Sequence, residues 1–171
     1  MVQFDSKISE KDLYEFNLHH VYTSSQGIIS LVAGGIGIGA AIVSFGTVDM
    51  FYTVAYVILG ILFLIYLPVT LKIKSKSQLS MSPVLQGTLH FSMEDEGIVV
   101  TTDVVSEGQD NKAVLPWKNV YKIITTKKSL LIYSSRVNAY IIPKNQVLDI
   151  IDEIKAECTK NLEAHRISIK W

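Results

Sequence analysis

A glycine-rich stretch at residues 33–41, AGGIGIGAA, is the first feature of the sequence that suggests chemistry. Loops of this composition cradle phosphates when they follow a strand, open a helix and carry a lysine or an acidic partner nearby. Here residues 27–45 contain no ionisable side chain, and the next lysine is Lys72. This context argues against a nucleotide site and favours an apolar helix with a face of small residues.

The histidines do not form a recognisable catalytic or metal-binding pattern. His19 and His20 are adjacent, and adjacent helical residues point about 100° apart, so they do not easily share one metal ion. His90 falls on the polar face of a predicted strand, and His165 lies near the chain end; neither has an evident partner. We therefore expect no metal site and no cofactor.

The other reactive groups are equally isolated in the sequence. Cys158 lies within an apolar helical stripe, and no histidine or acid stands at a spacing that would activate it, so we interpret it as a packed core thiol. The acidic run Glu94 to Glu96 is most simply a solvated turn. We therefore predict that the protein is not an enzyme.

The charge balance argues against a nucleic-acid partner. The chain carries 16 basic and 16 acidic side chains, which gives a net charge of zero. Nucleic-acid-binding proteins usually show a basic excess. Apolar residues make up 49% of the sequence, and their concentration in two stretches points to the lipid bilayer as the partner.

Two long uncharged stretches predict a transmembrane hairpin over residues 26–72. Residues 27–45 would form a helix about 28 Å long, close to the hydrocarbon thickness of a bilayer. Residues 50–71 are also uncharged and are rich in Val, Ile, Leu and Phe, which favour insertion. A short turn, Gly46 to Asp49, connects the two spans.

Small residues of the first span are candidates for helix packing. Gly35 and Gly39 form one small-xxx-small pair, and Ala33 and Gly37 form another. Such faces let a second helix approach closely. The partner helix is either the second span of the hairpin or a helix of another copy or another membrane protein.

The distribution of lysines predicts the orientation of the hairpin. Lys7 and Lys11 precede the first span, whereas the turn between the spans has no basic residue. Lys72, Lys74 and Lys76 follow the second span. Both termini are therefore expected in the cytoplasm. The last three lysines either anchor the span or also contact anionic lipid headgroups.

Residues 1–25 are predicted to form a cytoplasmic amphipathic helix that leads into the first span. Ser9 and Asp12 have the spacing of a capping box, which typically opens a helix.

Residues 82–165 are predicted to form an α+β domain. Short alternating segments with hairpin-length links indicate an antiparallel sheet; the six expected strands are residues 87–93, 98–105, 112–117, 120–126, 129–135 and 139–143. A helix capped near Asn145 follows, and its apolar stripe is Val147, Ile151, Ile154, Cys158 and Leu162. This succession predicts a pleckstrin-homology-like half-barrel capped by its C-terminal helix, with residues 166–171 as a tail.

The sequence resembles the YcxB-like membrane proteins of Gram-positive bacteria. The resemblance is carried by SEKDLYEFNLHH before the two spans, by LPWKNVYKI and by KKSLLIYSSRVNAYIIPKNQ. It implies a multi-pass protein of the bacterial cell membrane with a cytoplasmic domain similar to bacterial pleckstrin-homology domains, and it implies no activity. The aromatic residue expected soon after Pro143 and Lys144 is absent.

Three residues of these motifs, Trp117, Tyr140 and Pro143, are expected to be structural. For Trp117 the alternative is an exposed side chain that enters the membrane interface beside Lys118 and Lys122.

Two functions follow from these expectations. The first is a non-enzymatic membrane protein that presents an interaction domain for a protein or a lipid headgroup. The second is an accessory subunit of a membrane transporter or of an antimicrobial-peptide resistance complex.

Overall fold

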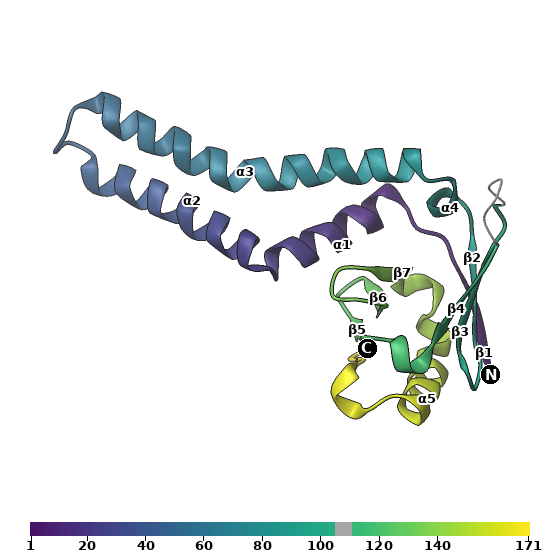
Figure 1. Ribbon diagram of the computed structural model, residues 1–171. Helices are drawn as coiled ribbons and strands as arrows, with labels where there is room; N and C mark the ends of the chain where they lie inside the picture. Colours follow the sequence, from purple (N-terminus) through teal and green to yellow (C-terminus); the bar gives the residue numbers. More distant parts are fainter. Residues whose placement is uncertain (105–110) are drawn as a thin grey trace. The chain divides into compact units, whose positions relative to one another are not determined.

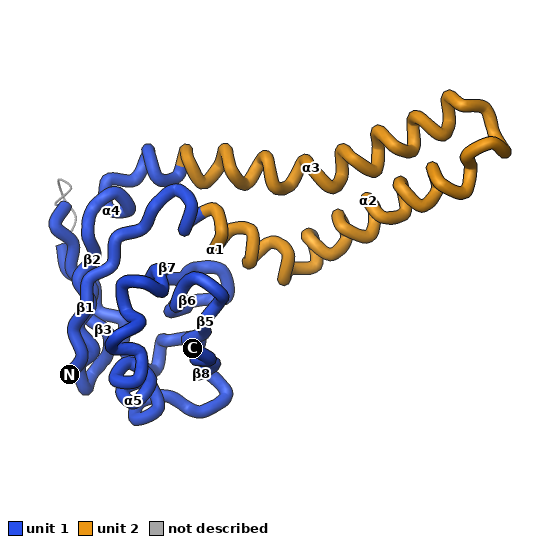
Figure 2. Tube along the Cα trace, turned by 180° about the vertical axis from the view of Figure 1, so that it is seen from behind, with its two compact units in different colours: residues 1–13, 78–171 blue, residues 14–77 orange. Residues whose placement is uncertain are grey.

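The computed structural model describes residues 1–104 and 111–171, and this part of the chain divides into two compact units (Figures 1 and 2). Met1–Leu13 and Gln78–Trp171 form one, which we call the sheet unit. Tyr14–Ser77 form the other, the helical unit. The helical unit is thus an insertion in the sequence of the sheet unit. The predicted end of the second strand at Val105, and most of the turn after it, lie outside the described residues.

Helix α1 (Glu10–Tyr22) begins at the predicted capping box. The Ser9 backbone N–H donates to Asp12 Oδ2 at 2.8 Å, and the Asp12 N–H donates to Ser9 Oγ at 3.3 Å. Residues before Ser9 are not helical, so the prediction of a helix over residues 1–25 is wrong at its N-terminal end. Helix α2 (Ser25–Ser44) follows, with Ser24 as its N-cap.

Helices α2 and α3 (Met50–Met81) are the two helices of the described chain that are long and apolar enough to cross a membrane. Their mean hydropathies are 2.0 over Gly27–Ser44 and 2.5 in α3, and most of their side chains are exposed. Helix α3 continues through Pro68 to Met81, beyond the predicted end of the span at residue 72. Lys72, Lys74 and Lys76 are therefore exposed helical residues.

The first sheet contains a strand that the sequence analysis missed. Among the described residues its order is β1-β2-β3-β4 with antiparallel pairing throughout. Strand β1 (Val2–Ser6) buries alternate residues and pairs with β2 (Leu89–Met93). Strands β3 (Gly97–Thr102) and β4 (Lys112–Pro116) complete the sheet.

The second sheet has the order β7-β6-β5-β8 in the described chain. Strands β5 (Lys122–Thr125), β6 (Ser129–Tyr133) and β7 (Ala139–Pro143) are antiparallel, as predicted. Strand β8 (Ile167–Ser168) pairs parallel to β5. Residues 166–171 are therefore part of the fold and not a tail.

The C-terminal helix starts later than predicted. Asn145 lies in a 3₁₀ turn, η2 (Lys144–Gln146), which is followed by η3 (Leu148–Ile150) and then by α5 (Ile151–Asn161). The N-cap of α5 is Ile150 and not Asn145. The apolar stripe is nevertheless buried as predicted, because it faces the core of the sheet unit.

One hydrophobic core joins both sheets and α5. Its buried side chains come from every strand of the first sheet except β4, from β5, β6 and β7, and from α5, for example Phe4, Phe91, Ile123, Ile132 and Ile154. Phe4 of β1 stacks on Phe91 of β2, with 5.0 Å between the ring centroids. The N-terminal strand is therefore a full member of the core, although the helical unit separates it in sequence from the other strands.

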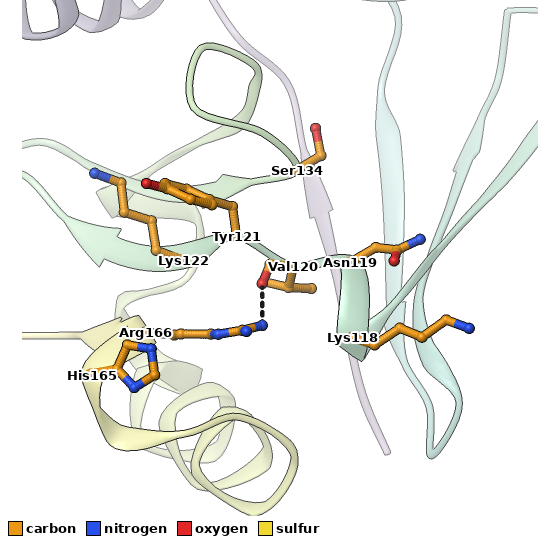
Figure 3. A pocket seen from close by; sticks show the side chains of 8 residues that line it. All are labelled: Lys118, Asn119, Val120, Tyr121, Lys122, Ser134, His165 and Arg166. Atoms are coloured by element: carbon orange, nitrogen blue, oxygen red, sulfur yellow. Dashed lines mark hydrogen bonds between the residues drawn. The ribbon is translucent and has the colours of Figure 1, made fainter.

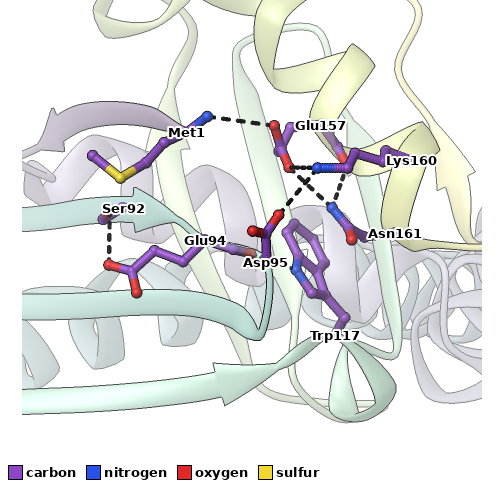
Figure 4. A network of polar contacts seen from close by, with 8 residues as sticks. All are labelled: Met1, Ser92, Glu94, Asp95, Trp117, Glu157, Lys160 and Asn161. Atoms are coloured by element: carbon purple, nitrogen blue, oxygen red, sulfur yellow. Dashed lines mark hydrogen bonds and ion pairs between the residues drawn. The ribbon is translucent and has the colours of Figure 1, made fainter.

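Ion pairs connect α5 to the N-terminus and to the turn between β2 and β3 (Figure 4). The Met1 amino group lies 3.7 Å from Glu157 Oε2. Lys160 Nζ lies 3.1 Å from Asp95 Oδ1 and 3.6 Å from Glu157 Oε1. Lys160 and Asp95 are exposed, so solvent screens their pair and its contribution to stability is small.

Candidate functional site

A pocket of about 410 Å³ in the sheet unit gathers three cationic side chains and a histidine (Figure 3). We call it the basic pocket. The segment from η1 (Trp117–Asn119) into β5, the end of β6 and η4 (Ala164–Arg166) supply its lining residues, which are Lys118, Asn119, Val120, Tyr121, Lys122, Ser134, His165 and Arg166.

Buried residues on both sides of a short turn hold one wall of the basic pocket. The Trp117 indole N–H donates to the Glu94 carbonyl at 2.8 Å, and Val120 is fully buried. The Val120 N–H donates to the Trp117 carbonyl at 3.1 Å. Lys118 and Asn119 lie between these two anchors and are exposed. The core therefore fixes the backbone from which the two polar side chains extend.

Strand β8 brings Arg166 to the opposite wall. Ile167 pairs with Ile123, which places the preceding residue beside the start of β5. Arg166 Nη1 donates to the Val120 carbonyl at 3.2 Å (Figure 3). A guanidinium has five N–H donors. This hydrogen bond fixes the orientation of the guanidinium and uses one of its five donors.

The three cations of the basic pocket have no acidic partner among the described residues. Within the described residues, no carboxylate lies within 4.0 Å of the charged groups of Lys118, Lys122 or Arg166. Lys122 Nζ instead lies 4.7 Å from the centroid of the Tyr133 ring. Burial raises the pKa of Tyr133, so its ring is neutral and attracts the ammonium through its face. The arrangement is suited to hold an anion.

His165 differs from the three cations because it has an acidic neighbour. Its Nδ1 lies 3.2 Å from Glu163 Oε2, and both side chains are exposed. The Arg166 side chain lies next to it in the pocket (Figure 3).

His90 has two partners that the sequence analysis did not find. Its Nδ1 lies 2.6 Å from Asp5 Oδ1, and its Nε2 lies 2.7 Å from Asp103 Oδ1. Hydrogen bonds to Asp103 and then to Asp5 raise the pKa of His90 above 6.5. Because each ring nitrogen faces a different carboxylate, the three residues form an ion-pair chain. Among the described residues, no three His, Cys, Asp or Glu side chains are arranged so that they could hold a metal ion.

Cys158 is fully buried in the core. Burial raises its pKa to about 12, so the thiol stays protonated at neutral pH and is a poor nucleophile.

The hairpin contact of the helical unit uses Gly37, which belongs to a predicted pair, and Gly34, which belongs to neither pair. A Cβ on Gly37 would lie 2.8 Å from Gly60 Cα, and a Cβ on Gly34 would lie 2.6 Å from Leu64 Cγ. At Gly35 and Gly39 a Cβ would meet nothing within 4 Å. A contact of these two residues inside the hairpin is therefore excluded; contact with a helix of another chain stays a prediction.

The spacing of small residues in α2 indicates the face that contacts α3. Gly34, Gly37 and Ala41 are three and four residues apart, which places them on one face of the helix, and Ala41 is buried. Ala33 is only half-buried.

Trp117, Tyr140 and Pro143 all lie in or against the core. Trp117 is only 7% exposed, which fits a structural role and not a membrane-facing one. The Tyr140 ring packs edge-on against Phe91, with 5.6 Å between the centroids. Pro143 is buried and pairs with Ser129 at the end of β7.

The lysines after the second span surround a buried polar contact. Ser75 lies between Lys74 and Lys76 and is fully buried, and Asn17 Nδ2 of α1 donates to its hydroxyl at 2.9 Å. Contact of Lys72, Lys74 and Lys76 with lipid headgroups stays a prediction.

Residues 94–156 match the family model of the YcxB-like proteins. This segment is YcxB-like. The match confirms the resemblance for LPWKNVYKI and KKSLLIYSSRVNAYIIPKNQ, whereas SEKDLYEFNLHH and the two spans lie outside the matched residues. No curated protein or solved structure matches the chain. The YcxB-like segment contains the Lys118–Lys122 wall of the basic pocket, whereas His165 and Arg166 lie beyond its end.

Arg166 is not among the predicted site residues, because residues 166–171 were expected to form a tail. Strand β5, which pairs with the neighbouring β8, and the basic residues around η1 are far from Arg166 in the sequence. The available signal was the alternation of Ile167 and Ile169 after Arg166, which is typical of a short strand.

Proposed function

We propose that this protein is a non-enzymatic integral membrane protein that presents a pleckstrin-homology-like interaction domain at the cytoplasmic face of a bacterial cell membrane. The observation that carries the proposal is the pairing of β1 with β2 within one sheet, although both candidate spans lie between these strands in the sequence.

This pairing supports an even number of membrane crossings. Strand β1 precedes α2, and β2 follows α3, yet Val2 is opposite Met93 and Ser6 is opposite Leu89. Two strands that share backbone hydrogen bonds must lie on the same side of a bilayer. Two spans satisfy this condition, and one span would not. The lysines beside the spans favour the cytoplasmic side.

The architecture of the sheet unit supports an interaction role. Its two sheets are antiparallel apart from the β5–β8 pair, and α5 contributes to the same core, which is the arrangement expected of a pleckstrin-homology-like domain. Cys158 is buried and His90 is ion-paired with two aspartates, which supports a role other than catalysis for both residues. The YcxB-like match and the fold support the class of protein; the binding role is inferred from the basic pocket.

Cysteine labelling tests the membrane topology. In a Cys158→Ala background, Thr47→Cys should react with a membrane-impermeant maleimide in intact cells. Lys127→Cys and Gln3→Cys, both at exposed positions, should react only after the membrane is made permeable. Labelling of either position in intact cells, or recovery of the chain in the soluble fraction, would contradict the proposal.

An accessory-subunit role is the second candidate, and one observation favours it. Gly35 and Gly39 lie on a side of α2 where an added Cβ meets no other atom of the described hairpin. A helix of a transporter or of an antimicrobial-peptide resistance complex could approach closely there. In that case Gly35→Leu should release a membrane protein that co-purifies with the wild type in mild detergent, whereas an unchanged co-purification pattern would leave only the first role.

A further inference from the structure

We propose that the basic pocket binds the phosphate group of a phosphorylated ligand, either a soluble phosphate monoester or the headgroup of an anionic lipid. This inference rests on the proposed function in one respect, which is that the sheet unit acts by binding.

The charge of the pocket is the first reason. The whole chain has a formal net charge of zero, yet three cations line this one pocket, and no described carboxylate pairs with them. Like charges around one pocket repel one another where no counter-charge lies beside them. A bound anion would remove this repulsion, so the pocket should bind anions more strongly than the rest of the surface.

The geometry of Arg166 is the second reason. Its guanidinium is held to the Val120 carbonyl at 3.2 Å, so part of the ordering cost of binding is already met in the free protein. The N–H groups that remain can form paired hydrogen bonds to two oxygens of one phosphate. Lys118 and Lys122 lie on either side of Arg166, and their ammonium groups point away from its guanidinium (Figure 3). As point charges on flexible stems, both can reach an anion that Arg166 holds.

The size of the pocket indicates that more than a bare anion fits. A volume of about 410 Å³ lies within the roughly 300–1,000 Å³ typical of small-molecule sites. Tyr121, Asn119 and Ser134 add neutral hydrogen-bonding groups to the lining. The pocket can therefore hold a phosphate together with the polar group to which it is attached.

Phosphate fits the pocket better than a carboxylate does. A phosphate monoester carries about −1.5 to −2 charges at pH 7 and three strong acceptor oxygens. A carboxylate carries one charge and two oxygens. Three cations without a described carboxylate partner and several neutral donors match the first anion, while a carboxylate would leave part of the charge uncompensated.

The test uses the full chain in a neutral detergent and measures the melting temperature at constant ionic strength. The soluble probes are inorganic phosphate and glycerol 3-phosphate, with acetate as the carboxylate comparison. The lipid probe is dihexanoyl phosphatidic acid, with dihexanoyl phosphatidylcholine as its neutral control. We expect a concentration-dependent rise in melting temperature with the phosphate probes, because a ligand that binds the folded state stabilises it.

Variants connect the effect to the pocket. Lys118→Gln changes an exposed side chain with no described partner, so it should fold normally, and combining it with Arg166→Gln should weaken the apparent affinity by about tenfold or more. Arg166→Lys should recover part of the loss, since it keeps the charge but not the paired hydrogen bonds. The matched control is Lys112→Gln with Lys155→Gln, which removes two exposed charges elsewhere on the sheet unit and should leave binding unchanged.

Each arm of the experiment decides one question. Stabilisation by soluble phosphates indicates a soluble ligand, and stabilisation by phosphatidic acid alone indicates a lipid headgroup. Absence of stabilisation by any phosphate probe, an equal effect of acetate, or an equal loss in the control variant would overturn the inference. The maleimide labelling pattern does not depend on the pocket. If labelling is as expected and binding fails, the pocket inference alone is wrong; the reverse result refutes the proposed function.

Discussion

Trp117 links the core of the sheet unit to the turn that carries Lys118. Its side chain is 7% exposed, and its indole N–H donates to the Glu94 carbonyl at 2.8 Å (Figure 4). Trp117→Ala should lower the free energy of unfolding by about 3–5 kcal/mol, because it leaves a large cavity. Thermal melting of the full chain in detergent measures this.

Trp117→Phe is the control for this prediction. It keeps most of the buried apolar surface and loses the hydrogen bond to Glu94, so it should cost less than the alanine variant. An alanine variant that melts with the wild type would show that the indole is not a core residue.

His90 should make the stability of the sheet unit depend on pH. Asp103 and Asp5 raise its folded-state pKa above the ordinary value of 6.5, which we take for the unfolded chain. The stabilisation is therefore fully present below pH 6.5 and is lost as the pH rises through the raised pKa. The melting temperature of the wild type minus that of His90→Gln should decrease as the pH is raised above 6.5.

Replacement of Asp5 or Asp103 tests whether these carboxylates cause the pH dependence. Asp103→Asn should reduce the pH-dependent difference, and Asp5→Asn should reduce it further in combination, because each aspartate pairs with one ring nitrogen. A difference that is independent of pH between 5.5 and 8 would contradict the ion-pair chain.

At the level of elements, the α2–α3 contact depends on Gly37 and Gly60. A Cβ on Gly37 would lie 2.8 Å from the Gly60 backbone, which cannot move aside as a flexible side chain can. Gly37→Leu should therefore destabilise the hairpin by at least the roughly 1–3 kcal/mol that is typical of overpacking. Circular dichroism of the chain in detergent, followed on heating, reports the loss of helix.

Gly35→Leu is a matched control on the same helix. A Cβ at Gly35 meets nothing within 4 Å, so the variant should melt like the wild type as long as no second chain is bound. Equal destabilisation by both variants would show that the contact face of α2 is assigned incorrectly.

At the level of the whole chain, the sheet unit needs residues from both sides of the hairpin. Residues 78–171 alone lack β1, which contributes Val2 and Phe4 to the core and covers the edge of β2. This fragment should melt without a cooperative transition or should aggregate through the open edge. The same fragment with residues 1–8 joined to its N-terminus by a Gly/Ser linker should melt cooperatively.

The comparison of these two fragments also bears on the membrane topology. If residues 78–171 alone were as stable as the linked form, β1 would not be required, and the same-side argument for the termini would lose its support. The full chain in detergent provides the reference melting temperature.

The sequence alone determined the elements that are stabilised by contacts within one segment, or that carry apolar residues at a regular spacing along one face. The uncharged lengths of residues 27–45 and 50–71 predict helices that suit a bilayer, and the structure has two such helices there. Short alternating segments predict the strands from β2 to β7, and the stripe from Val147 to Leu162 predicts the buried face of α5. The Ser9–Asp12 capping box is equally local, since both partners lie within one helical turn.

Tertiary structure decided which distant segments meet. Strand β1 is stable as a strand only because β2 pairs with it, so a capping signal nearby led the sequence analysis to a helix at its position. The same holds for β8, which places Arg166 against Val120, and for His90, whose two carboxylates come from other segments. Strand pairing joins residues that are far apart in the chain, and alternation within one segment does not identify the partner strand. The basic pocket therefore exists only in the folded chain.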